Sequence, residues 1–146
     1  PFVINDDLEM AVKYGVGVHL GQGDGEVVEA VARLPKDVVI GRTCLNSIEL
    51  AEKAIAEGAT YVAFGAIYAT ETKPEAGNIG LETLKEAKAK LNVPICAIGG
   101  LTVENSGEVI EAGADLCAVI SDILGLSMSA IPDRIEQWAD LFASKA

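Results

Sequence analysis

Six short apolar runs, each followed by a segment with helical spacing, constrain the fold of this chain more than any other feature. The runs cover residues 2–4, 17–20, 38–41, 61–64, 94–98 and 116–120. Each is almost wholly apolar and is followed by polar or glycine residues, as is typical of a parallel strand buried on both faces. Helices are predicted after them, over residues 8–14, 26–34, 47–57, 81–91, 103–112 and 131–144. The chain is therefore predicted to consist of six consecutive strand–helix units.

Polar residues follow every predicted strand, and their distribution distinguishes two kinds of parallel sheet. The candidate site residues at these strand ends, which include two glycines, are Asn5, Asp6 and Asp7; Gln22 and Asp24; Thr43; Thr70, Thr72 and Lys73; Gly99, Gly100 and Thr102; and Ser121 and Asp122. Consecutive strand–helix units form either an open doubly wound sheet or a barrel. A doubly wound sheet gathers its site at one switch point, whereas a (β/α)₈ barrel draws on the ends of all its strands. The pattern favours the α/β class and the TIM-type (β/α)₈ barrel, of which six units form an incomplete barrel.

Local signals mark the ends of several helices. Asn46, with Glu49 three residues later, is predicted to cap the helix over residues 47–57. Gly15, Gly58 and Gly113 each follow a helical segment, where a left-handed C-terminal cap favours glycine. These signals support the predicted helix boundaries.

Length, charge and cysteine content exclude several classes of protein. With 146 residues the chain is expected to form one domain, over residues 1–146, with a substantial core. The net charge of −11 argues against nucleic acid as a partner, and no apolar run approaches the roughly 20 residues of a membrane helix. Cys44, Cys96 and Cys117 show no C-x-x-C spacing. They are expected to be free thiols, which favours a reducing, cytoplasmic location.

The loop that follows residues 61–65 is the first candidate for ligand binding. It contains Thr70, Thr72 and Lys73 at the end of a predicted strand. Two hydroxyls and an ammonium can all donate hydrogen bonds to the oxygens of a phosphate or diphosphate. The alternative is a solvated surface loop, and the spacing alone favours that alternative.

Two aspartates that follow successive strands form a candidate metal site. Asp6 and Asp24 would stand side by side at the rim of a barrel. Mg²⁺ is usually held by one or two carboxylates together with substrate phosphate oxygens and water. The alternative for Asp6 and Asp7 is that they cap the helix that follows them. The alternative for Asp24, which lies between two glycines, is that it forms a turn. The spacing alone slightly favours these two alternatives over a metal site.

A glycine pair is a second candidate for phosphate binding. Gly99 and Gly100 join a predicted strand to a predicted helix. Glycines allow backbone N–H groups to approach a phosphate, and a helix N-terminus adds favourable partial charge. Ser121 ends the next strand and is expected to complete the same pocket. A glycine turn without a ligand is the alternative.

His19 and the aromatic residues of the last helix are predicted to be structural. His19 is the only histidine, and no serine or cysteine is evidently paired with it, so a catalytic triad is unsupported. Trp138 and Phe142 are four residues apart on a predicted helix, which is typical of core packing.

Five phrases of the sequence together resemble the thiamine-phosphate synthase (thiamine-phosphate pyrophosphorylase) family. They are FVINDD at 2–7, GVHLGQGD at 17–24, FGAIYATETK at 64–73, AIGGLTVEN at 97–105 and AGADLCAVIS at 112–121. They occur in the family's order and span almost the whole chain. The resemblance implies a (β/α)₈ barrel and a transferase. The reaction it implies joins 4-amino-5-hydroxymethyl-2-methylpyrimidine diphosphate to 4-methyl-5-(2-phosphoethyl)thiazole, which gives thiamine phosphate and diphosphate.

The resemblance also implies roles for individual residues. Asp6 and Asp24 would hold Mg²⁺ on the diphosphate. The implied catalytic residues are Asn5, which would contact the pyrimidine, and Lys73, which would meet the diphosphate. The implied ligands of the thiazole phosphate are Thr70, Thr72, Gly99, Gly100, Ile120 and Ser121. Thr43 stands where the family usually has serine, so the hydroxyl of this substrate-binding position is retained.

The chain begins at what would be the third strand of the family. The first two strand–helix units and the Q-x-R-x-K segment that grips the pyrimidine diphosphate are absent from the sequence. Six units cannot close an eight-stranded barrel, and an open barrel exposes the edges of its sheet. We therefore expect either an N-terminally truncated form, inactive or weakly active alone, or a chain that covers its open edge in a homo-oligomer.

Three other functions remain open from the sequence. A thiazole tautomerase-like paralogue shares the barrel but does not couple substrates, and a metal-free isomerisation has no need of the paired Asp6 and Asp24. An inactive phosphate-ligand binding fragment would be stabilised by thiazole phosphate without turnover. A different phosphate-binding barrel enzyme would require the INDD and HLGQ-x-D matches to be chance.

Overall fold

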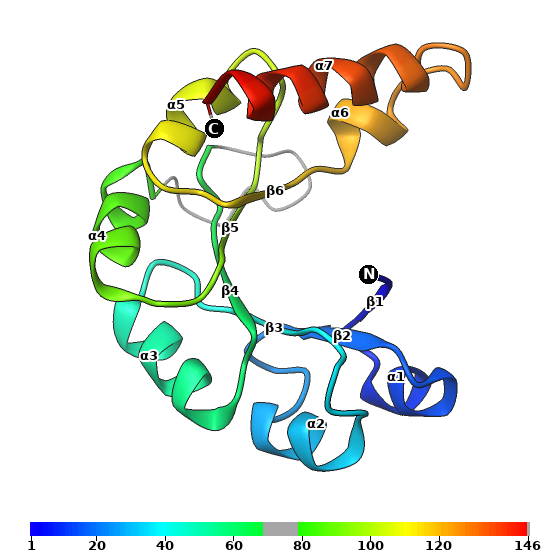
Figure 1. The fold of residues 1–146 in the computed structure, drawn as a ribbon, viewed down its shortest axis with the longest axis vertical. Coiled ribbons are helices and arrows are strands. Elements are labelled where there is room, and N and C mark those ends of the chain that lie inside the picture. The colour runs from blue at the N-terminus through cyan, green and yellow to red at the C-terminus, as the bar shows by residue number, and fades with distance from the viewer. Residues whose placement is uncertain (69–78, 146) are drawn as a thin grey trace.

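The computed structural model describes residues 1–68 and 79–145, and it contains one six-stranded sheet (Figure 1). The strands are β1 (Val3–Asn5), β2 (Gly17–Leu20), β3 (Ile40–Thr43), β4 (Tyr61–Phe64), β5 (Ile95–Ile98) and β6 (Leu116–Ala118). They are ordered in the sheet as in the chain, and every neighbouring pair is parallel. The predicted parallel sheet is therefore confirmed. Thr70, Thr72 and Lys73 lie outside the described residues.

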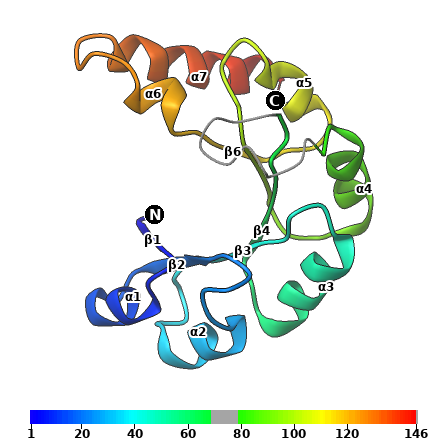
Figure 2. The ribbon, with the colours of Figure 1, turned by 180° about the vertical axis from the view of Figure 1, so that it is seen from behind.

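Helices cover the convex side of the sheet. They are α1 (Leu8–Tyr14), α2 (Val27–Arg33), α3 (Ile48–Glu57), α4 (Glu82–Lys90), α5 (Ser106–Glu111), α6 (Ser121–Leu124) and α7 (Ile131–Lys145). The sheet curls into an open arc with α1 to α5 along its outside, and α6 and α7 follow β6 at one end (Figures 1 and 2). Within the described residues β1 and β6 each pair on one side alone, so six strand–helix units form an incomplete barrel with two open edges. None of the described helices is long and apolar enough to cross a membrane.

The start of α5 and the presence of α6 differ from the sequence prediction. α5 begins at Ser106 rather than at residue 103. The Asn105 side chain accepts a hydrogen bond from the Thr102 N–H and donates one to the Gly100 carbonyl, both at 2.9 Å. This side chain therefore holds the preceding residues in a turn. α6 is a single helical turn that the sequence analysis did not predict.

The cap of α3 also differs from the prediction. Ser47, not Asn46, is the N-cap residue, and its hydroxyl accepts a hydrogen bond from the Leu50 N–H at 3.2 Å. The prediction for Asn46 was wrong because Ser47 itself has the extended backbone, with φ of −109°, that an N-cap requires. The C-terminal glycines Gly15 and Gly58 have φ of 63° and 107°, which confirms their predicted left-handed caps.

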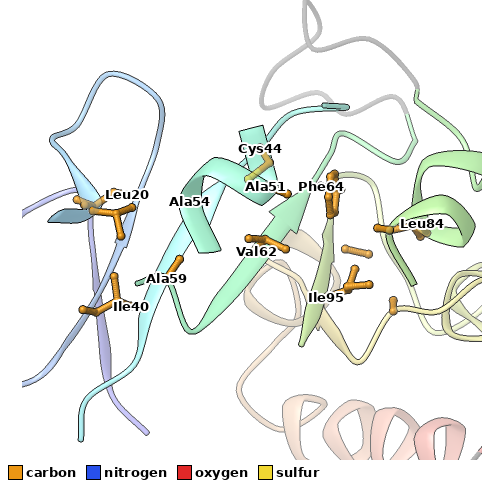
Figure 3. Packing of buried hydrophobic residues seen from close by; sticks show 14 of the residues in the cluster. Leu20, Ile40, Cys44, Ala51, Ala54, Ala59, Val62, Phe64, Leu84 and Ile95 are labelled. Carbon is orange, nitrogen blue, oxygen red and sulfur yellow. The ribbon is translucent and has the colours of Figure 1, made fainter. Parts of the chain in front are cut away.

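The core is the layer between the convex face of the sheet and the helices. Leu20 is fully buried in this layer, whereas His19 before it lies on the concave face, since strand residues alternate. On α3, the buried Ala51 and Ala54 are small enough to let the helix approach Val62 of β4 closely (Figure 3). The alternation along β2 therefore directs the polar side chain of His19 to the concave side.

Other packing predictions are confirmed as well. Trp138 is buried in the core cluster, and its ring centroid lies 6.4 Å from that of Phe142. The three cysteines are free thiols. Burial raises the pKa of Cys96 to about 12, so its reactive thiolate form is suppressed near neutral pH.

Leu84→Ala is expected to lower the free energy of unfolding by about 2–5 kcal/mol, because it opens a cavity beneath α4. Leu84 is 0% exposed, whereas Leu124, which is 73% exposed, provides a matched control. Leu124→Ala is expected to be nearly neutral. Urea denaturation of both variants tests this, and equal losses would contradict the assignment of the core.

Candidate active site

The carboxyl ends of the strands form one rim of the half-barrel, because neighbouring strands are parallel and closely in register. Thr43 at the end of β3 pairs with Ala63, and Phe64 at the end of β4 pairs with Ala97. The described candidate residues lie within or just after strand ends at this rim: Asn5, Asp6, Asp24, Thr43, Gly99, Gly100, Ile120 and Ser121. The shared rim predicted from the sequence is therefore present.

Asp6 and Asp24 come together beside Gly21, although they follow different strands. The Gly21 N–H donates a hydrogen bond to Asp6 Oδ1 at 3.4 Å. A Cβ atom at Gly21 would overlap Asp24 Oδ2 and would lie 3.7 Å from Asp6 Oδ1. Both carboxylates therefore border the small space that a side chain at Gly21 would fill.

The backbone at Asp6 adopts an uncommon conformation. Its φ of 63° lies in the left-handed region, which few residues other than glycine adopt. Its N–H donates to the His19 carbonyl at 2.8 Å, and its Oδ2 accepts from Asn5 Nδ2 at 2.7 Å. Asp7, rather than Asp6, caps α1, since Asp7 Oδ1 accepts from the Met10 N–H at 2.8 Å. The capping alternative therefore applies to Asp7, and the Asp6 carboxylate remains for another role.

Asp24 lies in a turn, as its alternative interpretation predicted. Its N–H donates to the Gly21 carbonyl at 3.2 Å, across the loop that joins β2 to α2. The turn directs the Asp24 carboxylate back towards Gly21. The turn and a ligand-binding role are therefore compatible.

A shallow cleft of about 440 Å³ contains both carboxylates. It is lined by Asn5, Asp6, Asp7, Leu8, Glu9, Asp24, Gly25 and Glu29. Arg33 pairs with Glu9 at 2.5 Å and with Glu29 at 2.9 Å, and its hydrogen bond lowers the pKa of Glu9. Neither Asp6 nor Asp24 forms an ion pair with any described residue. The cleft therefore offers negative charge to a cation.

The carboxylate oxygens of Asp6 and Asp24 beside Gly21 fit Mg²⁺ better than a softer metal, because carboxylate oxygens are hard ligands. In the part of the chain that the structure describes, no group of three or more His, Cys, Asp or Glu residues could hold a metal. Asp6 and Asp24 would therefore need further oxygens, which water or a phosphorylated ligand would supply.

His19 uses both nitrogens of its ring on the concave face. Nδ1 lies 2.6 Å from the Tyr61 hydroxyl, and Nε2 lies 2.8 Å from the Thr43 hydroxyl. Burial lowers the pKa of His19 and outweighs the opposing charge of Asp6. The imidazole is therefore neutral near pH 7, and the engagement of both ring nitrogens within the fold supports the predicted structural role.

The Tyr61 hydroxyl favours one direction for this hydrogen-bond chain. Burial raises the pKa of Tyr61 to about 12, so the phenol stays protonated and its O–H can donate a hydrogen bond to Nδ1 of His19. In the corresponding tautomer, Nε2–H donates to Thr43 Oγ1. The hydroxyl hydrogen of Thr43 then remains for a ligand at the rim.

The predicted phosphate-binding residues that are described lie on a different part of the rim. Gly99 and Gly100 have φ of 101° and 66°, which favours glycine at both positions. A Cβ atom at Gly99 would also lie 2.5 Å from Ala66 Cβ, so glycine permits a close approach to the loop after β4. Ile120 and Ser121 are exposed at the start of α6. These residues follow β5 and β6, whereas the carboxylate pair follows β1 and β2, at the opposite end of the sheet order.

Arg42 is a buried charged residue near the two carboxylates, and it was not predicted from the sequence to belong to the site. It lies in β3, and its guanidinium donates to the carbonyls of Gly21 and Gly25 in the loop that contains Asp24. The Gln22 side chain of the same loop donates to the Thr43 carbonyl. The sequence signal that could have revealed this contact was a charged residue directly after the strand predicted over residues 38–41.

A family model described as thiamine monophosphate synthase matches residues 1–123. The chain belongs to the thiamine monophosphate synthase family. The match includes all six strands and every described candidate residue at the rim. The family comprises transferases of thiamine biosynthesis, which bind small phosphorylated pyrimidine and thiazole substrates.

Solved structures of thiamine phosphate pyrophosphorylases resemble this member of the thiamine monophosphate synthase family. The enzyme from Pyrococcus furiosus is 29% identical with a TM-score of 0.86, over 99% of this chain and 68% of that chain. The enzyme from Bacteroides thetaiotaomicron is 18% identical with a TM-score of 0.62, over 97% of this chain and 69% of that chain. A FabK variant from Thermotoga maritima is 18% identical with a TM-score of 0.66, over 84% and 43% of the two chains. The last two likenesses show the fold alone.

The free energy of unfolding is expected to fall as the pH drops from 7.5 to 5.5. The unfolded chain binds a proton at His19 near the ordinary pKa of 6.5, whereas burial keeps the folded imidazole neutral to lower pH. His19→Gln is expected to flatten this dependence, because His19 is the only histidine. Urea denaturation across this range measures both slopes. Equal slopes would show that His19 is not protected from protonation in the fold.

Proposed function

We propose that this chain carries the coupling site of a thiamine-phosphate synthase. The reaction joins 4-amino-5-hydroxymethyl-2-methylpyrimidine diphosphate to 4-methyl-5-(2-phosphoethyl)thiazole and forms thiamine phosphate and diphosphate. The observation that carries the proposal is the meeting of the Asp6 and Asp24 carboxylates beside Gly21, at the rim of a half-barrel of this family.

In this proposal Asp6 and Asp24 hold Mg²⁺. The bound ion would stabilise negative charge on the departing diphosphate, an effect worth several kcal/mol in such sites. Asn5 contacts the pyrimidine and also orients Asp6, because Asn5 Nδ2 donates to Asp6 Oδ2 at 2.7 Å. The side-chain amide oxygen of Asn5, Oδ1, remains to accept a hydrogen bond from the substrate.

The proposed binding of the organic substrates uses the rest of the rim. Thr43 donates its hydroxyl hydrogen to a substrate, with its orientation set by His19. Gly99, Gly100, Ile120 and Ser121 bind the thiazole phosphate, together with Thr70 and Thr72. Lys73 contacts the diphosphate and acts as a catalytic residue. No general base is required when the diphosphate departs first, which agrees with the engagement of both His19 nitrogens.

Two alternatives make different predictions. A thiazole tautomerase-like paralogue would isomerise a thiazole without Mg²⁺, and a phosphate-ligand binding fragment would gain thermal stability from thiazole phosphate without turnover. The paired carboxylates favour the synthase over both, because neither alternative requires them. Mg²⁺-dependent formation of thiamine phosphate would distinguish the three.

Asp24→Asn is expected to lower the rate of thiamine phosphate formation by at least about 100-fold, because a weakened metal site loses several kcal/mol of leaving-group stabilisation. Mg²⁺ binding, measured by calorimetry on the same protein, reports the site even where turnover is slow. Asp140→Asn removes the same charge from an exposed position of α7 and serves as the control. An equal effect of the two variants would contradict the metal site.

Gly21→Ala is expected to weaken Mg²⁺ binding by about tenfold or more. The free energy of unfolding is expected to change by less than about 1 kcal/mol, since the new methyl group displaces the exposed Asp24 carboxylate rather than the backbone. Gly23→Ala is the matched control, because a Cβ atom there meets nothing within 4 Å. Unchanged Mg²⁺ affinity in Gly21→Ala, measured by calorimetry, would show that the two carboxylates do not bind the ion beside Gly21.

A further inference from the structure

We propose that Arg42 is a positioning residue that anchors the loop between β2 and α2, so that Asp24 stays beside Asp6. The inference rests on the proposed function, in which these two carboxylates hold Mg²⁺.

Arg42 lies on the helix-facing side of the sheet, away from the concave face. It pairs in register with Leu20 of β2 and Val62 of β4, both of which are fully buried in the core. Arg42 itself is 7% exposed. A guanidinium stays charged in proteins, and burying a charge is costly unless it is well hydrogen-bonded. The groups that Arg42 contacts are therefore held strongly to it.

Those groups are carbonyls at both ends of one loop. Arg42 Nη1 donates to the Gly25 carbonyl at 2.6 Å and to the Gly21 carbonyl at 3.0 Å, and Nη2 approaches the Gln22 carbonyl at 3.5 Å. Within residues 1–68 and 79–145, Arg42 forms no ion pair with a carboxylate. The loop backbone thus supplies the acceptors for this buried charge. The planar fork of donors suits several carbonyls at once, which a lysine ammonium on a flexible stem does not.

Gly21 connects Arg42 to both carboxylates. Its carbonyl accepts from Arg42 and from the Asp24 N–H, and its own N–H donates to Asp6 Oδ1. Asp6 and Asp24 are exposed, so core packing does not fix their side chains. Loss of Arg42 would therefore release the loop and, with it, the placement of Asp24 relative to Asp6.

The test compares Arg42→Met and Arg42→Lys with Arg134→Met in the full chain. Arg134, on α7, forms an ion pair with Glu104 at 2.7 Å. Its replacement controls for the loss of an anchored arginine elsewhere in the chain. Hydrogen exchange of the amides of residues 21–25 is measured without metal, relative to the amides of β4. Calorimetry then gives the Mg²⁺ affinity of each folded variant.

Arg42→Met is expected to increase exchange in residues 21–25 selectively and to weaken Mg²⁺ binding by about tenfold or more, as for other groups that orient metal ligands. Arg42→Lys is expected to restore little of either property, because it keeps the charge and loses the fork. Arg134→Met is expected to match the wild-type chain in both. If Arg42→Met fails to fold, Arg42→Lys decides the proposal by the same two measurements.

Two results would overturn the proposal: unchanged exchange in residues 21–25, or increased exchange with unchanged Mg²⁺ affinity. Absence of Mg²⁺ binding by the wild-type chain would contradict the proposed metal site instead. In that case the exchange of residues 21–25 would still decide whether Arg42 anchors the loop.

Discussion

The parallel register of the six strands is the constraint on which the rest of this structure depends. Neighbouring strands pair residue by residue, so their carboxyl ends reach one rim and their side chains alternate between two faces. A slip of one residue in β2 would move His19 into the apolar layer and Leu20 onto the concave face. The core therefore fixes the register, and the register in turn decides which polar groups meet.

Two polar systems use the two faces of the sheet. On the concave face His19 joins Tyr61 and Thr43 in a chain of hydrogen bonds, whereas on the convex side Arg42 reaches from the core to the loop after β2. Both place their partners at the rim, and both satisfy buried polar groups that would otherwise be costly. In the part of the chain that the structure describes, no buried side-chain polar atom lacks a hydrogen-bond partner. Packing and site geometry thus arise from the same contacts.

The charge of the rim fits the chemistry of the family. The chain has a net charge of −11, and the cleft beside Asp6 and Asp24 is lined mainly by carboxylates. Such a cleft repels a free diphosphate but attracts a divalent cation, which is the arrangement expected where an anionic substrate binds together with its metal. Those proposed phosphate ligands that the structure describes, Gly99, Gly100, Ile120 and Ser121, lie outside this cleft, after β5 and β6.

The sequence by itself determined the order of strands and helices, the parallel sheet and the rim on which the candidate residues lie. These follow from local periodicity, which depends on residues close in the chain. Tertiary structure alone decided that Asp7 rather than Asp6 caps α1, that Gly21 is the point where the Asp6 and Asp24 carboxylates meet, and that Arg42 donates hydrogen bonds to the loop that contains Asp24. Tertiary structure also decided that Ser47, and not the predicted Asn46, caps α3. The physical reason is that such contacts join residues distant in sequence, or depend on the φ and ψ of single residues, and spacing along a chain encodes neither.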